Sequence, residues 1–120
     1  MHELSIAQEI FTIVQQNVED EKQKLVRSIN VKIGKLSSVL PDSLLFCFDA
    51  IKANTNLQNA LLMIERTPVI IECKACLSKS EIEPPIFACP NCKSNNIKMI
   101  SGDELLVREI ELTENIEEKL

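Results

Sequence analysis

The sequence predicts an α+β protein in which two helices lie on a small, mostly antiparallel sheet and a four-cysteine zinc-ribbon lobe is inserted into the chain. Three observations carry this prediction. Apolar residues recur every three or four positions in two segments, which is the period of an amphipathic helix. In another segment they alternate with polar residues, which is the period of a strand. Two Cys-x-x-Cys pairs lie close together in the second half of the chain.

The first helix is predicted over residues 3–20, followed by a solvated connector at 21–24 and a strand at 26–34 that ends at Gly34. The second helix is predicted over about 42–53. The apolar stripe of the first helix is made of Leu4, Ala7, Phe11, Val14 and Val18. We expect this stripe to pack in the core, since a core face is the usual role of such a pattern.

The second half of the chain supplies the remaining strands. Val69-Ile70-Ile71 predicts a strand that runs directly into the first cysteine pair. The segments 97–100 and 104–112 predict a hairpin about Ser101-Gly102-Asp103. We therefore expect one α+β domain, residues 1–71 and 97–120, with a metal-binding domain at 72–96 inserted between two adjacent strands.

The two cysteine pairs have the spacing of a structural zinc site. Four thiolates from Cys73, Cys76, Cys89 and Cys92 can surround one Zn²⁺ as a tetrahedron. Two disulfides would need an oxidising compartment, and nothing at the N-terminus resembles a signal peptide. A thioredoxin-like redox site uses one such pair beside a βαβ unit, for which this chain has little room. The fifth cysteine, Cys47, is expected to be a small buried apolar residue of the second helix.

Composition narrows the class of protein. The chain has 120 residues, 45% of them hydrophobic, and a net charge of −5. No apolar run approaches the roughly 18–20 residues of a membrane span, so we expect a cytoplasmic protein without a membrane partner. In residues 72–99 four lysines oppose three glutamates, and the zinc-thiolate site would make this lobe slightly negative. Nucleic-acid binding needs a basic surface and stacking aromatics, so the lobe argues against a nucleic-acid partner.

The first three residues offer a second metal site. A histidine directly after a free N-terminal residue can chelate one metal through the α-amine of Met1, the deprotonated amide nitrogen of His2 and its imidazole Nδ1. Ni(II) and Cu(II) are the ions that readily displace the amide proton. The carboxylate of Glu3 can fill a fourth position. The alternative from the residues alone is that His2, the only histidine, lies in a frayed terminus without a role.

Several stretches together resemble one family. These are Met1-His2-Glu3-Leu4-Ser5, Gly34-Lys35-Leu36-Ser37-Ser38-Val39, Pro41-Asp42-Ser43-Leu44-x-Phe46-x-Phe48, both cysteine pairs, Gly102-Asp103-Glu104-Leu105 and Ile110-Glu111-Leu112. In this order, over essentially the whole chain, they resemble the HypA/HybF family of hydrogenase nickel-insertion proteins.

The resemblance implies roles for individual residues. His2 becomes the principal nickel ligand, aided by the Met1 amine and local backbone nitrogens, with Glu3 as a ligand or as an orienting carboxylate. Asp42 matches an acidic residue of the family that approaches the nickel. Its alternative role is the N-cap of the second helix. The four cysteines match the zinc ligands of the family.

The resemblance implies a metallochaperone rather than an enzyme, with structural Zn²⁺ and transported Ni²⁺. The implied partners are a nickel-handling GTPase and the hydrogenase large-subunit precursor, and urease is a further possible recipient. The chain itself would be a monomer or weak homodimer. The alternatives are a structural zinc-ribbon adaptor without a nickel role and a nucleic-acid-binding ribbon. A zinc hydrolase is disfavoured, because four thiolates leave no position for a water molecule.

Overall fold

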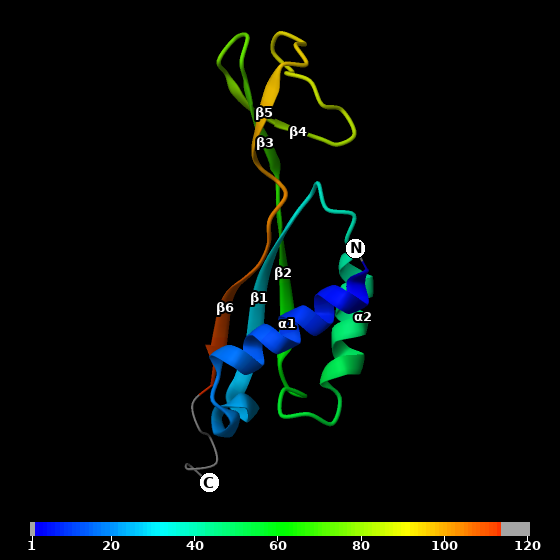
Figure 1. Cartoon of the computed structure of the whole chain (residues 1–120), viewed down its shortest axis with the longest axis vertical. Helices are drawn as coiled ribbons and strands as arrows, with labels where there is room; N and C mark the ends of the chain where they lie inside the picture. The colour runs from blue at the N-terminus through cyan, green and yellow to red at the C-terminus, as the bar shows by residue number, and fades with distance from the viewer. Residues whose placement is uncertain (1, 114–120) are drawn as a thin grey trace. The chain divides into compact units, whose positions relative to one another are not determined.

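A computed structural model describes residues 2–113 and confirms the α+β class. Over residues 2–113 the elements are two α-helices, a 3₁₀-helix and six strands (Figure 1). Their bounds, in chain order, are α1 Glu3–Asn17, η1 Asp20–Leu25, β1 Val26–Gly34, α2 Pro41–Lys52, β2 Leu61–Thr67, β3 Val69–Cys73, β4 Lys79–Ile82, β5 Ile97–Ser101 and β6 Leu105–Leu112. The strands form two three-stranded sheets, in the orders β2-β1-β6 and β4-β3-β5.

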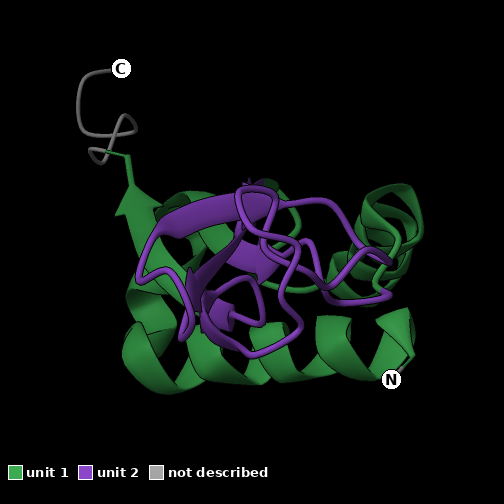
Figure 2. Ribbon diagram, turned by 90° about the horizontal axis from the view of Figure 1, so that it is seen from above, with its two compact units in different colours: residues 1–31, 39–64, 107–120 green, residues 32–38, 65–106 purple. Residues whose placement is uncertain are grey.

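The chain packs as two compact units (Figure 2). Unit 1 comprises residues 1–31, 39–64 and 107–120, and unit 2 comprises residues 32–38 and 65–106. Unit 2 holds all four cysteines of the two pairs and is wider than the predicted 72–96 segment. This division describes packing, and the assignment of a nickel-binding and a zinc-binding domain stays a prediction.

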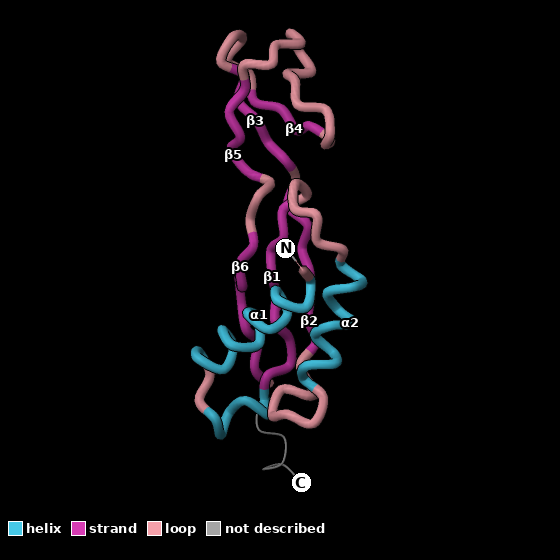
Figure 3. Tube along the Cα trace, turned by 45° about the vertical axis from the view of Figure 1, so that its right-hand side comes forward, coloured by secondary structure: helices cyan, strands magenta, loops and turns pink. Residues whose placement is uncertain are grey.

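Unit 1 is built from the two amphipathic helices and the strands beside them. Helices α1 and α2 pack against each other (Figure 3). Their buried faces join the inward residues of β1, so that burial of aliphatic side chains stabilises the unit. The buried side chains include Ile6, Ile10, Val14, Ile29, Val31, Leu44 and Phe48.

The first helix is shorter than predicted, and a second helical segment follows it. Helix α1 ends at Asn17, with Val18 in an extended conformation at its C-cap. The predicted solvated connector at 21–24 forms part of the 3₁₀-helix η1; Glu21, Lys22 and Lys24 are exposed as predicted, but Gln23 is buried. Buried Gln23 explains the turn, since its side-chain amide donates to the carbonyl of Val18 at 3.1 Å and to Asp20 Oδ1 at 3.2 Å. A buried polar side chain thereby obtains its hydrogen bonds.

Strand β1 occupies the predicted residues and pairs with the distant strand β6. Asn30 Nδ2 donates to Glu109 Oε1 at 2.8 Å, and Ser28 Oγ lies 3.4 Å from Glu111 Oε1. Residue numbers rise along β1 while they fall along β6, which is the pattern of antiparallel neighbours.

Unit 2 is organised about β3, which forms the predicted strand leading into the first cysteine pair. It pairs antiparallel with β4 on one side and with β5 on the other, where Cys73 lies opposite Ile97. Its core contains Val69, Ile71 and Ile82. Pro68 separates β3 from β2, because proline has no N–H to continue the hydrogen-bond ladder.

The predicted hairpin about Ser101-Gly102-Asp103 is wrong. Strand β5 pairs with β3, whereas β6 pairs with β1, so the two strands belong to different sheets. Gly102 has φ +121°, which an L-residue rarely adopts, and its carbonyl accepts the Leu36 N–H at 2.9 Å. The chain therefore leaves the turn toward residues 34–36 instead of folding back on β5.

Within residues 2–113, neither α-helix has the length and apolar character needed to cross a membrane.

The close backbone approach of Gly34 to Gly102 gives a stability prediction. A Cβ on Gly34 would collide with the Gly102 carbonyl group and lie 2.6 Å from the Asp103 nitrogen. We expect Gly34→Ala to lower the free energy of unfolding by about 2 kcal/mol or more, because backbone atoms must move apart. Urea unfolding followed by circular dichroism measures the change. The exposed Ser38→Ala control should stay within about 0.5 kcal/mol of the parent, and an equal midpoint for both variants would contradict the close approach.

Candidate metal centre

The four predicted zinc ligands come together in unit 2. Their sulfurs all lie within 4.8 Å of one another, with Cys73 and Cys92 at 3.5 Å and Cys76 and Cys89 at 3.7 Å. A tetrahedron with Zn–S bonds of about 2.3 Å has edges of about 3.8 Å, close to these separations. A disulfide needs an S–S distance of about 2.05 Å, and all four residues are free thiols. The donor set and its spacing fit one tetrahedral metal ion.

The first pair sits in a tight turn at the end of β3, which we call the first knuckle, from Cys73 to Ser78. The N–H groups of Ala75 and Cys76 donate to Cys73 Sγ at 3.3 and 3.4 Å. The Cys73 N–H bonds the Ser78 carbonyl, and the Leu77 N–H bonds the Cys73 carbonyl, both at 2.9 Å. Backbone donors thus point at the sulfur, as a thiolate ligand requires.

The second knuckle, from Cys89 to Ser94, repeats this turn. The Cys89 N–H bonds the Ser94 carbonyl at 2.9 Å, and the Lys93 N–H bonds the Cys89 carbonyl at 2.8 Å. Lys93 has φ +67°, as Leu77 has φ +65° at the same place in the first knuckle. Neither residue is glycine or asparagine, so the sequence carried no signal for these left-handed positions.

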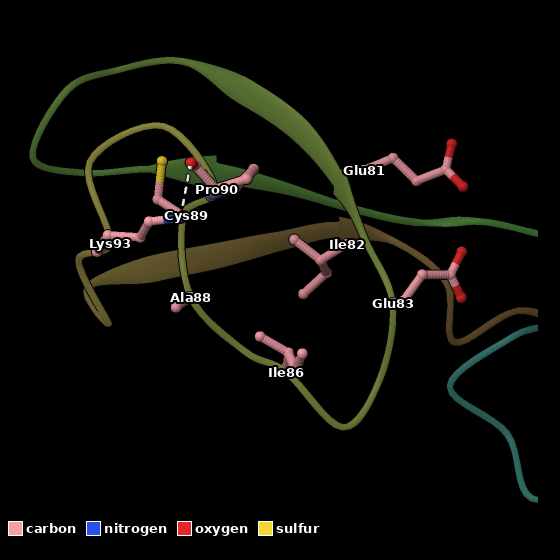
Figure 4. A pocket seen from close by; sticks show the side chains of 8 residues that line it. All are labelled: Glu81, Ile82, Glu83, Ile86, Ala88, Cys89, Pro90 and Lys93. Carbon is pink, nitrogen blue, oxygen red and sulfur yellow. Dashed lines mark hydrogen bonds between the residues drawn. The ribbon is translucent and has the colours of Figure 1, made fainter.

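The two sulfurs of each knuckle differ in exposure. Cys73 and Cys89 are fully buried, whereas Cys76 and Cys92 are exposed. A cavity of about 230 Å³ adjoins Cys89 (Figure 4). Its lining is formed by Glu81, Ile82, Glu83, Ile86, Ala88, Cys89, Pro90 and Lys93. The cavity lining is thus partly apolar where it meets Cys89 of the second knuckle.

The pKa of the Cys76 thiol is lowered and that of the Cys92 thiol is raised by their different surroundings. The hydroxyl and then the N–H of Ser78 lower the pKa of Cys76 to about 6, against the opposing effect of burial. At Cys92 the Ser94 N–H lowers the pKa, but the neighbouring thiols, Cys73 first, and burial outweigh it and raise the pKa to about 11. Binding of a divalent metal as a tetrathiolate therefore releases protons, and metal affinity falls as the pH is lowered.

Two further polar side chains, which the sequence did not single out, contact this centre. Ser78 Oγ lies 3.0 Å from Cys76 Sγ, and Asn91 Nδ2 donates to the same sulfur at 3.7 Å. Their position in the sequence, beside or between the cysteines, is the feature that could have predicted these contacts. Cys47, in contrast, is half-buried on α2 and is not a member of the cluster.

The N-terminal residues lie in unit 1, at the start of α1. His2 is exposed, and its carbonyl accepts the Ile6 N–H at 3.2 Å, the first hydrogen bond of the helix. The N–H groups that precede this bond have no partner within the helix. The amide nitrogen of His2 therefore makes no hydrogen bond within the helix. Met1 lies outside the described residues.

Glu3 links the N-terminus to the start of α2. Its Oε2 accepts the N–H of Leu40 at 3.0 Å, and Leu40 is the N-cap residue of α2. In a capping box a glutamate within the same helix accepts this N–H; here a glutamate of α1 does so. Asp42 is exposed in the first turn of α2, two residues after Leu40. The alternative role of Asp42 as the N-cap is therefore wrong, and its charge instead favours the positive helix end.

Comparison with known proteins decides the family. The family model described as "Hydrogenase/urease nickel incorporation, metallochaperone, hypA" matches residues 1–112. The chain belongs to the HypA family. Its class is accordingly that of a metallochaperone for nickel incorporation and not of an enzyme.

Individual HypA proteins match over nearly their full length. The hydrogenase maturation factor HypA of Desulfatibacillum aliphaticivorans is 38% identical over 120 residues, covering 99% of this chain and 92% of that protein. HypA of Trichormus variabilis is 40% identical over 114 residues, covering 95% and 97%. The solution structure of the Ni metallochaperone HypA from Helicobacter pylori shares the fold, with a TM-score of 0.64 at 21% identity over 93% of this chain and 97% of that one.

The contact between Glu3 and Leu40 predicts a pH-dependent signal. The Leu40 N–H is the main cause that lowers the pKa of Glu3 below 4.5. The hydrogen bond is therefore present above that pKa and is lost as the pH falls through it. We expect the Leu40 amide resonance in ¹H–¹⁵N NMR spectra to titrate with a midpoint below 4.5. Glu3→Gln should abolish this titration, and a persisting titration in the variant would contradict the contact.

Proposed function

We propose that this chain binds Ni(II) at its N-terminus and delivers it during maturation of [NiFe] hydrogenase. Family membership supports the nickel role. The structural observation that supports the location of the nickel site is the hydrogen bond between Glu3 and Leu40. It connects the residue after His2 to the start of α2, whose first turn contains Asp42. This contact supports a site that draws on His2, Glu3 and Asp42, because it joins the start of α1 to the start of α2.

The proposed nickel ligands are the Met1 amine, the His2 amide nitrogen and the His2 imidazole. Ni(II) tolerates such a planar set of nitrogens, and a carboxylate from Glu3 or Asp42 would complete it. The N-terminal end of a helix carries partial positive charge and favours anionic groups. The deprotonated amide and a carboxylate are such groups, and their negative charges would also balance the charge of Ni(II). Such a site is open on one side, and protonation of its nitrogens releases the nickel ion. Both properties suit transfer of the metal to a partner protein.

We assign the four-cysteine centre to a structural zinc ion in a zinc-ribbon lobe. Zn²⁺ prefers tetrahedral thiolate sites of this kind, and four protein ligands leave no open position for catalysis. The support is the sulfur cluster together with the backbone donors of the first knuckle. The proposal gives one chain a retained metal for structure and an exchangeable metal for delivery.

The proposed setting is the cytoplasm, where thiols stay reduced. The proposed partners are a nickel-handling GTPase and the hydrogenase large-subunit precursor, with urease maturation as a further possible recipient. The two glycines of the chain, Gly34 and Gly102, are too few and too far apart for a phosphate-binding P-loop. Any dependence on GTP would therefore come from the partner. We propose a monomer or a weak homodimer for the chain itself.

Zinc removal tests the structural centre. We expect chelation of the metal to unfold at least residues 72–96, because the knuckles lose the ion that holds four thiolates together. Hydrogen exchange by mass spectrometry should show lost protection in that segment while α1 stays protected. Cys73→Ala should lose the metal, whereas the matched Cys47→Ala should keep one zinc per chain. Unchanged protection after complete zinc removal would contradict a structural role.

Nickel titration tests the N-terminal site. In untagged protein that begins at Met1, we expect one Ni(II) per chain by calorimetry, with an absorption band of planar nitrogen coordination. His2→Ala should remove this binding and leave zinc in place. A Gly-Ser extension before Met1 should weaken it at least about tenfold, because it displaces the α-amine from the chelate.

The control for this titration is the same Gly-Ser dipeptide added after Leu120, which should leave nickel binding unchanged. Asp42→Ala distinguishes the two candidate carboxylates when compared with Glu3→Ala. If nickel stoichiometry survives His2→Ala, the N-terminal assignment fails. If zinc is present and no variant binds nickel, the chain is a structural zinc-ribbon adaptor.

A further inference from the structure

The two knuckles have the same backbone but different side-chain contacts at their exposed sulfurs. Cys76 and Cys92 occupy equivalent positions, each three residues after a buried cysteine, and both are exposed. Each receives a backbone N–H from the serine two residues later, Ser78 or Ser94. Backbone geometry therefore does not distinguish the two sulfurs.

The side chains of the first knuckle add donors to Cys76. Ser78 Oγ lies 3.0 Å from Cys76 Sγ and 3.7 Å from Cys89 Sγ. A metal-bound thiolate has no proton to give, so the hydroxyl must be the donor. Asn91, between the second pair of cysteines, donates its Nδ2 to Cys76 Sγ at 3.7 Å.

The equivalent hydroxyl of the second knuckle is turned away. Ser94 Oγ accepts the N–H of Asn96 at 3.0 Å. The nearest side-chain contact of Cys92 Sγ among residues 2–113 is with another of the four thiols, Cys73 Sγ, at 3.5 Å. Among residues 2–113, no hydroxyl or amide side chain donates to the Cys92 sulfur.

We propose that Cys92 is the reactive ligand of the zinc centre, the thiolate that first attacks a soft carbon electrophile and thereby starts metal release. Hydrogen bonds withdraw electron density from a thiolate and stabilise it against reaction, and outer-shell partners tune ligands in this way. Cys76 carries two side-chain donors and Cys92 carries none. Ser78 and Asn91 are positioning residues in this view, and the inference rests on the proposed zinc occupancy.

The chemical step is a conjugate addition. The Cys92 sulfur forms a bond to one alkene carbon of N-ethylmaleimide, the π bond of that alkene opens, and water supplies the proton to the adjacent carbon. The sulfur becomes a thioether, which has no negative charge and binds Zn²⁺ poorly. Three thiolates, those of Cys73, Cys76 and Cys89, would remain to hold the ion.

The experiment uses zinc-loaded, full-length chain treated with limiting N-ethylmaleimide. Peptide fragmentation by mass spectrometry gives a modification rate for every cysteine, and a chromophoric chelator reports zinc release. We expect Cys92 to react at least about fivefold faster than Cys76, the factor that corresponds to roughly 1 kcal/mol for a hydrogen bond. Zinc release should follow Cys92 modification. Cys47, outside the cluster, serves as an internal unligated thiol.

Ser78→Ala and Asn91→Ala test the cause, and Ser94→Ala is the matched control at the equivalent position. In Ser78→Ala the rate at Cys76 should rise to within about twofold of that at Cys92, and zinc release should accelerate. Ser94→Ala should change neither rate, because its hydroxyl accepts the Asn96 N–H and, within residues 2–113, donates to none of the four sulfurs.

The outcomes separate this inference from the zinc assignment. Equal or faster reaction at Cys76 in the parent chain overturns the inference, and so does an equal effect of Ser94→Ala and Ser78→Ala. In both cases zinc at one ion per chain would leave the proposed structural site intact. Purified chain without zinc would instead overturn the zinc assignment, and the inference with it.

Discussion

The close approach of two glycines is the constraint on which unit 2 depends. Gly34 donates its N–H to the Glu104 carbonyl at 2.8 Å, and the Gly102 carbonyl accepts the Leu36 N–H at 2.9 Å. The Glu104 side chain closes the same junction, accepting the Thr67 hydroxyl at 2.7 Å and the Gly102 N–H at 2.9 Å. Three chain segments are thus fixed at one place. Strand β3 extends from this junction to Cys73, so backbone packing positions the first knuckle.

The two candidate metal sites use different chemistry in separate units. The thiolates of unit 2 lie at the end of a strand and in two hydrogen-bonded turns, so the site has a fixed shape. The site proposed in unit 1 would use the Met1 amine, the His2 imidazole and the His2 amide nitrogen, and the last of these precedes the first hydrogen bond of the helix. Glu3 accepts the Leu40 N–H and so connects the start of α1, beside the proposed site, to the start of α2. A rigid thiolate centre suits retention of a metal, and an open nitrogen site suits exchange.

Local patterns in the sequence predicted the two helices, strands β1 and β3 and the cysteine cluster, and long-range contacts account for what they missed. The alternation in residues 26–34 and the spacing of the cysteines were sufficient for β1 and the sulfur cluster. The turn at Gly102 was identified, but its direction depends on partners near residue 34. The left-handed positions at Leu77 and Lys93 had no glycine to mark them. The bond between Glu3 and Leu40 joins two helix starts, which no periodicity reveals.

The pairing of β1 with β6 has a consequence for synthesis on the ribosome. Ser28 meets Glu111 across 83 positions of sequence, and unit 2 lies between these strands in the chain. The sheet of β1 therefore stays incomplete until almost the whole chain has emerged, and its edge is exposed for that time. Such late closure is a feature of high contact order and leaves nascent chains open to wrong strand pairing. A nascent HypA chain would thus acquire its cysteine turns before it finishes its first sheet.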